Sequence, residues 1–120
     1  MTDDMLEAEK HKTETELVDR IRIAAHRLAD AVSAEAALED NRHTIKYAVT
    51  ERIMLAGDNK FTGKPHSFSS AEAAATTDEE YINYLERLRS ATRERILARG
   101  EYDAACAAAR LREAVQRDRL

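Results

Sequence analysis

The chain has 120 residues, 35% of them charged, and a formal net charge of −4 at pH 7. This length allows one domain at most, and the negative balance excludes a general electrostatic attraction of the whole chain to nucleic acid. Hydrophobic residues make up 43% of the sequence, but alanine is the commonest of them and tryptophan is absent. The composition therefore favours a thin seam between helices over a broad core.

The cysteine content and the hydropathy pattern predict a soluble, cytoplasmic protein. The single cysteine, Cys106, excludes an intramolecular disulfide and any multi-cysteine metal site within one chain, and it is consistent with a reducing compartment. No apolar run approaches the roughly 20 residues that a membrane helix needs. The acidic start of the chain lacks a signal-peptide pattern, so we expect no membrane partner.

Residues 3–56 contain neither glycine nor proline and predict one long helix. The apolar residues recur at steps of three and four. A strict seven-residue repeat would place Glu35 and Arg42 on the seam between helices. Either the repeat drifts toward eleven residues, or both charged residues are buried and fix the register. We favour the drift, because apolar neighbours can take up the contact, namely Val32, Ala36 and Leu38.

Residues 57–69 interrupt the helical pattern and predict a tip between two helices. They contain the only proline, both phenylalanines and two of the three glycines. Gly57 stands where a left-handed helix C-cap belongs, and the residues around Pro65 are typical of turns.

The tip allows a structural and a functional interpretation. In the first, which we favour, Phe61 and Phe68 fold back onto the apolar end of the first helix, at Ile53, Met54 and Leu55, and plug the hairpin. In the second, basic and aromatic side chains form a recognition site, because such pairs can bind phosphate and stack on nucleobases. The candidate interaction tip consists of Lys60, Phe61, Lys64, His66 and Phe68.

Two further helices are expected after the tip. A capping box that begins at Ser69 predicts a short helix over 70–75. Thr76-Thr77 then interrupts the pattern, and each threonine begins a new capping box, so we expect a kink or a break before a long helix over 78–118. The sequence leaves open whether the helix is continuous at Thr76-Thr77 and at Gly100, since a glycine inside a helix costs only about 1 kcal/mol.

The long helix carries an apolar stripe and an arginine-rich face. The stripe also drifts from a strict seven-residue repeat, and its members are Tyr81, Leu85, Leu88, Thr92, Ile96, Ala98, Tyr102, Ala105 or Cys106, Ala109 and Val115. Arginine is the residue suited to planar, bidentate contacts. The candidate basic face consists of Arg89, Arg93, Arg95 and Arg99. A solvated face with ion pairs four residues apart is the simpler interpretation.

Two patterns that could carry chemistry are incomplete. Asp40-x-x-His43 has the spacing of a di-iron bundle motif, but no histidine follows the tip, so a second motif would have to come from another copy. Cys106 lies in an alanine-rich stretch, with no histidine obviously within reach to activate it. We therefore predict no catalytic, cofactor or metal site, and no enzyme activity.

The layout resembles that of uncharacterised small helical-hairpin (coiled-coil) proteins of phages and mobile elements. In those proteins an Asn-x-x-Thr-Gly-Lys segment joins two long charged helices, and the matching residues here are Asn59, Thr62, Gly63 and Lys64. The resemblance implies an origin more than an activity.

Together these patterns predict an all-α fold, a long antiparallel helical hairpin that forms a single domain over 1–120. Two copies are expected to pair into a four-helix bundle, because one thin hairpin buries little surface. The expected function is a non-enzymatic protein-interaction or oligomerisation module, with an accessory or inhibitor role in a phage or mobile element. The alternative is a nucleic-acid-binding accessory factor that uses the arginine-rich second helix and the basic tip.

Overall fold

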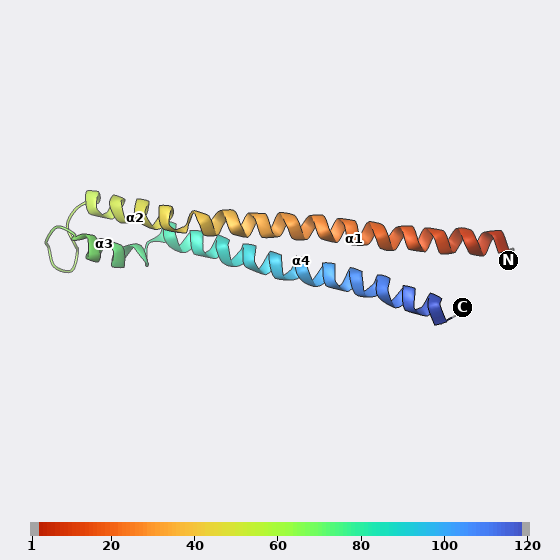
Figure 1. Cartoon of the computed structure of the whole chain (residues 1–120). Coiled ribbons are helices and arrows are strands. Elements are labelled where there is room, and N and C mark those ends of the chain that lie inside the picture. Colours follow the sequence, from red (N-terminus) through yellow and green to blue (C-terminus); the bar gives the residue numbers. More distant parts are fainter. Residues whose placement is uncertain (1–2, 119–120) are drawn as a thin grey trace. The chain divides into compact units, whose positions relative to one another are not determined.

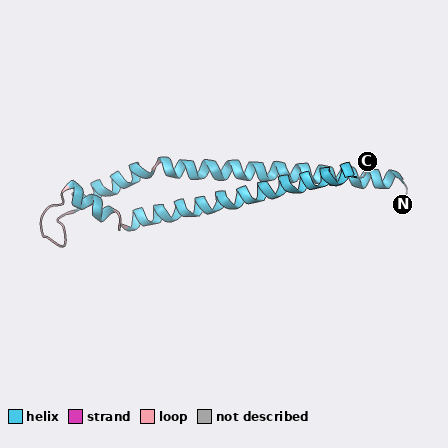
Figure 2. Ribbon diagram, turned by 60° about the horizontal axis from the view of Figure 1, so that its bottom comes forward, coloured by secondary structure: helices cyan, strands magenta, loops and turns pink. Residues whose placement is uncertain are grey.

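The structure, a computed structural model, describes the backbone of residues 3–118 and the side chains of residues 14–118. Its four helices are α1 (Asp3–Asp40), α2 (Arg42–Ala56), α3 (Phe68–Ala75) and α4 (Glu79–Asp118), in the order that Figure 1 labels. Strands are absent from the described residues, which form helices and connecting loops (Figure 2). The predicted all-α class is confirmed.

The chain divides into two compact units, and α1 and α4 each contribute to both. Unit 1 combines Met1–Val32 with Arg93–Leu120, and unit 2 is Ser33–Thr92. Within each unit, the segment that precedes the tip lies beside the segment that follows it.

The direction of pairing is antiparallel in both units. In unit 1, Gln116 Nε2 donates to Glu14 Oε1 at 3.0 Å, whereas Arg27, further along α1, meets Glu101, which comes earlier in α4. In unit 2, the Tyr84 hydroxyl donates to the carbonyl oxygen of Leu38, whereas the later Arg52 meets the earlier Asp78. The predicted helical hairpin is therefore confirmed.

The seam of unit 1 follows a strict seven-residue repeat on both helices. On α1 the residues withdrawn from solvent are Leu17, Ile21, Ala24, Leu28 and Ala31. On α4 they include Arg95, Ala98, Tyr102, Ala105, Ala109, Arg112 and Gln116. Among the described residues of unit 1, the only fully buried hydrophobic side chains are Ala24, Ala98 and Ala105. This seam is thin, as the composition predicts.

The drift that the sequence suggested is wrong. On α4, Ile96 is mostly exposed and the half-buried Arg95 occupies the seam instead. On α1, Val32 is exposed and Glu35 is half-buried. Long polar side chains are tolerated at such positions because their aliphatic stems pack on the seam while their charged ends reach its edge.

Unit 2 holds the larger hydrophobic core. Its centre consists of Val49, Ala75, Tyr81 and Tyr84, and the partly buried residues packed around it are Leu38, Ile45, Ile53 and Leu85. The rings of Tyr81 and Tyr84 stack with centroids 6.2 Å apart. The centre of this core comes from α2, α3 and the start of α4, and the end of α1 adds Leu38.

The predicted uninterrupted helix over 3–56 is wrong, because Asn41 separates α1 from α2. Its backbone lies at φ −87° and ψ −1°, in the sparsely populated bridge region. The Tyr84 hydroxyl donates to the Leu38 carbonyl oxygen, which in a continuous helix would accept from the Arg42 N–H. A side chain that enters the helical ladder is a known cause of a break. Arg42 is exposed and its guanidinium bonds Glu39 at 3.3 Å, so it does not fix the register from within the seam.

The short helix begins earlier than predicted, because a different serine caps it. The side chain of Ser67 accepts from the backbone N–H of Ser70 at 3.1 Å, and α3 starts at Phe68. The capping box expected at Ser69 is therefore wrong by two residues.

A break separates α3 from α4, as expected. The two threonines were expected to cap the start of the next helix, but they bond to the end of α3 instead. The hydroxyls of Thr76 and Thr77 donate back to the carbonyl oxygens of Ala73 and Ala74, at 2.6 and 3.1 Å. They close α3, whereas Asp78 begins the next helix. From Glu79 onward α4 is continuous through Gly100.

Candidate functional site

The tip loop is closed by its own hydrogen bonds. The Asn59 N–H donates to the Lys64 carbonyl oxygen at 2.8 Å, and the Gly63 N–H donates to the Asn59 carbonyl oxygen at 2.8 Å. The Asn59 side chain accepts from the Phe61 N–H at 2.9 Å. Gly63 has a φ of +67°, a left-handed conformation that glycine adopts without strain. These bonds order the loop independently of the helices.

Phe61 lies at the outer edge of this loop with 99% of its surface exposed. Lys60 and Lys64, on either side of it in the sequence, are exposed as well. The prediction that Phe61 plugs the hairpin is therefore wrong. Its backbone is held by the Asn59 turn, while the half-buried Ile53 packs against the unit 2 core without it.

The second phenylalanine and the end of α2 also leave apolar surface uncovered. Phe68, the first residue of α3, is about half exposed, and Leu55 is 81% exposed. Neither Phe68 nor Leu55 belongs to the core cluster of unit 2. The expected plug is therefore absent at Phe61, whereas about half of the Phe68 surface is covered.

His66 is fixed by the start of α3 and is less available than the lysines. Its Nδ1 lies 3.0 Å from Ser70 Oγ, and the ring is half-buried. Ser70 Oγ also lies 3.1 Å from the Ser67 carbonyl oxygen, to which its hydroxyl can donate, so Ser70 links the His66 ring to the start of α3.

A hollow of about 820 Å³ lies beside the loop in unit 2. Apolar side chains from the end of α2 and from α3, including Ile53 and Ala74, line part of it, and Phe61 stands at its edge. At its other side Arg52 Nη2 bonds Asp78 Oδ1 at 2.7 Å, and this carboxylate raises the pKa of Arg52. Among the described residues no group of three or more His, Cys, Asp or Glu side chains could hold a metal ion.

The structure does not gather the candidate basic face into one accessible surface. Arg95 is half-buried on the seam of unit 1. Arg99 is exposed but pairs with Asp103 at 3.5 Å. Arg89, in unit 2, and Arg93, in unit 1, are exposed. The four arginines therefore do not form a continuous basic surface. Their arrangement agrees better with the simpler interpretation, a solvated helix face with local ion pairs.

The residues named by the two incomplete chemical patterns lie on three different helices, α1, α2 and α4. Asp40 ends α1 and His43 lies in α2, on the other side of the break, and both are exposed. Cys106 is half-buried, and its hydrogen bond with Tyr102 raises the pKa of that tyrosine. Cys106 is best described as a packing residue beside the seam.

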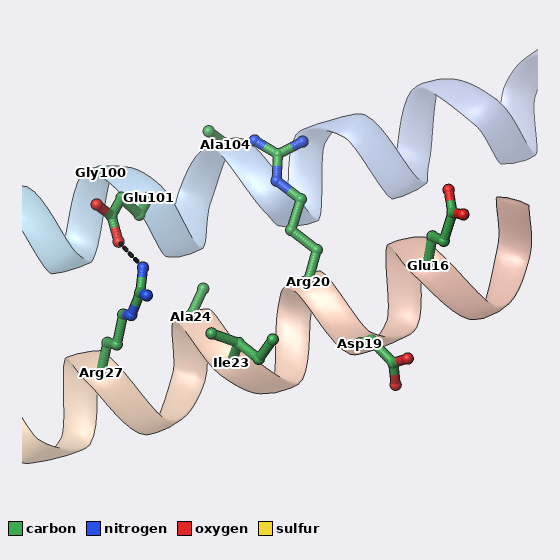
Figure 3. Close-up of a pocket in the computed structure, with 9 residues that line it drawn as sticks. All are labelled: Glu16, Asp19, Arg20, Ile23, Ala24, Arg27, Gly100, Glu101 and Ala104. Carbon is green, nitrogen blue, oxygen red and sulfur yellow. Dashed lines mark ion pairs between the residues drawn. The ribbon is translucent and has the colours of Figure 1, made fainter.

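A surface that the sequence interpretation missed lies on unit 1. A hollow of about 710 Å³ is lined by α1 residues that include Arg20 and Ile23 and by Gly100, Glu101 and Ala104 of α4 (Figure 3). Arg27 and Glu101 form an ion pair of 3.6 Å at its edge (Figure 3). A second hollow, of about 520 Å³, shares these two residues and is lined by Leu97.

The sequence contained a signal for this surface. Leu97, Ala104, Leu111 and Val115 are separated by seven, seven and four residues, a spacing that repeats along one side of a helix. The sequence interpretation missed it because it assigned the apolar residues of this helix, Val115 included, to a single stripe.

Comparisons with protein-family models, with curated proteins and with solved structures found no match. Among the described helices, none has the length and the apolar character that crossing a bilayer requires.

Proposed function

We propose that this protein is a non-enzymatic protein-interaction or oligomerisation module whose tip binds a second protein. The observation that carries this proposal is the position of Phe61, 99% exposed on a loop with its own hydrogen bonds. An aromatic anchor at the centre of an interface can dominate its binding energy. A loop that is ordered before binding loses little entropy when it docks.

The charges around Phe61 define the chemistry of the partner. Lys60 and Lys64, on either side of Phe61 in the sequence, are exposed. An apolar pocket with carboxylates at its rim would accept the ring and pair with both ammonium groups. The similarity to hairpin proteins of phages and mobile elements supports an accessory or inhibitor role, in which the tip occupies such a pocket on a host protein.

The proposal is tested by capture from a lysate of the source cells and then by titration with the purified captured protein. We expect Phe61→Ala to weaken binding by about 30-fold or more, the effect of losing a hot-spot residue. Lys60→Glu with Lys64→Glu should weaken it as well, and more strongly at low salt. Tyr47→Ala removes another exposed aromatic side chain of unit 2 and is the matched control that should bind normally.

Nucleic acid is the alternative partner, and a gel shift with single- and double-stranded DNA and RNA distinguishes it. A shift that weakens with salt and disappears in Phe61→Ala would replace the protein-binding proposal with base stacking at the tip. Equal capture of a partner by the wild type and by Phe61→Ala would overturn the role of the tip.

A further inference from the structure

We infer that a second copy of this chain docks on unit 1 along an outer stripe of α4. This inference rests on the oligomerisation part of the proposed function and adds the surface and the arrangement of the copies. The outer stripe consists of Leu97, Glu101, Ala104, Ala108, Leu111 and Val115.

The outer stripe repeats the spacing of a helix seam on a second side of α4. Its members follow one another at steps of four and three, as the residues that face α1 do. Five of the six are apolar, and Leu97 and Leu111 are 61% and 67% exposed. A helix that meets only one neighbour carries one apolar stripe. A second stripe at the same spacing indicates a second helical neighbour.

One side chain of α1 next to this stripe, Ile23, extends the apolar surface, whereas most other α1 residues that line the hollow are charged, among them Asp19 and Arg20. Ile23 is about half exposed and lines the same hollow as Ala104 (Figure 3). The Arg27–Glu101 ion pair lies between that hollow and the one lined by Leu97. Apolar side chains of a packing helix could enter both hollows, as knobs enter holes.

The exposed area is large enough for the occupant to be a second copy of the chain. The chain exposes 9236 Å², about 2,700 Å² more than the roughly 6,500 Å² expected for a folded monomer of 13.5 kDa. An excess of this size is comparable to the area that each chain covers in an obligate homodimer, about 1,000–2,500 Å². A second copy would bury further apolar surface of unit 1. On its own, unit 1 has only three buried hydrophobic side chains among its described residues, and all three are alanines.

The charges on α4 are complementary to themselves in an antiparallel arrangement. A two-fold axis between Ala104 and Ala108 places Leu97 of one copy against Val115 of the other, and Glu101 beside Leu111. Arg112 then lies next to Glu101 of the second copy. A self-complementary patch of this kind closes into a dimer.

The first test is the mass in solution, by sedimentation equilibrium over a range of concentrations. We expect about 27 kDa, twice the 13.5 kDa of one chain. Leu111→Asp should raise the dissociation constant by about 100-fold or more, because the carboxylate would be buried without a partner. Leu55→Asp is the matched control, since Leu55 is an equally large and 81% exposed leucine of unit 2, and it should leave the mass unchanged.

A cross-linking test reports the arrangement even where Leu111→Asp fails to fold. In chains that carry Cys106→Ser, a mixture of Leu97→Cys and Val115→Cys proteins should form a disulfide-linked pair under mild oxidation, whereas neither variant alone should. A mass other than that of two copies, an unchanged dimer in Leu111→Asp that folds, or no cross-link in the mixture would overturn the inference. Phe61→Ala should keep the dimer mass, so failure at the tip and failure at this stripe are separate results.

Discussion

Tyr84 shows how one side chain can determine both packing and helix geometry. It is the largest side chain that is almost completely buried among the described residues. Its hydroxyl donates to the Leu38 carbonyl oxygen close to the break at Asn41. Burial, followed by the negative charge of Glu39, raises the pKa of Tyr84.

Tyr84→Phe should lower the free energy of unfolding by about 1 kcal/mol at neutral pH, the usual contribution of one hydrogen bond. Because the folded pKa is raised, the stabilisation is complete below the unfolded pKa of about 10 and is lost as pH rises toward the folded pKa. The wild type should therefore lose more stability than Tyr84→Phe above pH 10. Urea unfolding followed by circular dichroism at pH 7 and pH 10.5 measures both effects.

Tyr47→Phe is the control for this prediction, because Tyr47 is mostly exposed. The Tyr47→Phe variant should have the same free energy of unfolding as the wild type at pH 7. It should also lose the same amount of that free energy above pH 10. An identical alkaline fall in the wild type and in Tyr84→Phe would show that another group causes it.

At the scale of single residues, the sequence identified the exposed lysines of the tip but not the position of Phe61. Lys60 and Lys64 were expected at an accessible tip, and they are exposed. The ring of Phe61 was expected inside, because large apolar side chains are usually buried. The Asn59 side-chain bond that holds the loop is a local interaction, and hydrophobicity alone does not predict it.

Asp78 links two helices of unit 2 at the start of α4. Its carboxylate accepts from the Glu80 N–H at 3.0 Å, which makes it a helix cap, and from Arg52 Nη2 at 2.7 Å. The carboxylate is only partly exposed, whereas Arg52 is about half exposed. A cap contributes about 1 kcal/mol, and an ion pair with one exposed partner contributes less.

Asp78→Ala should lower the free energy of unfolding by about 1–2 kcal/mol, because it removes both the cap and the ion pair. Asp78→Asn keeps a side chain that caps equally well and should cost only about 0.5 kcal/mol. Chemical unfolding of the two variants beside the wild type makes the comparison. Equal losses would mean that the charge, and not the cap, stabilises this junction.

At the scale of helices, the sequence predicted which elements exist better than how they pack. Glycine, proline and the apolar periodicity were sufficient to predict the hairpin and its tip. The register was mispredicted because Glu35 and Arg95 occupy seam positions, and a pattern built from apolar residues omits them. The break at Asn41 was missed because no glycine or proline marks it, and Tyr84, which bonds the Leu38 carbonyl oxygen beside it, lies far away in the sequence.

For the whole chain, the two units differ in how much apolar side chain they bury. Unit 2 buries two tyrosines and a valine, whereas the fully buried hydrophobic residues of unit 1 are alanines, among the residues described. Local stability follows buried apolar surface. Unit 1 should therefore open more readily than unit 2 when the chain is dilute.

Hydrogen exchange measured by mass spectrometry tests this difference. At low protein concentration, amides of unit 1 should exchange about tenfold faster than those of unit 2, or more, which corresponds to about 1.4 kcal/mol. A higher concentration should slow exchange in residues 97–115, because a second copy that binds there stabilises them. Amides of the unit 2 core around Val49 should not respond, and equal protection of both units would contradict the prediction.

The closed tip loop has a consequence for how this protein can change over generations. Its backbone is held by Asn59 and Gly63, whereas the side chains of Lys60, Phe61 and Lys64 are exposed. Exposed substitutions away from special backbone positions usually alter stability by less than about 0.5 kcal/mol. These three positions can therefore mutate with little penalty to folding, so a lineage of such hairpins could exchange one target for another while keeping the same helices.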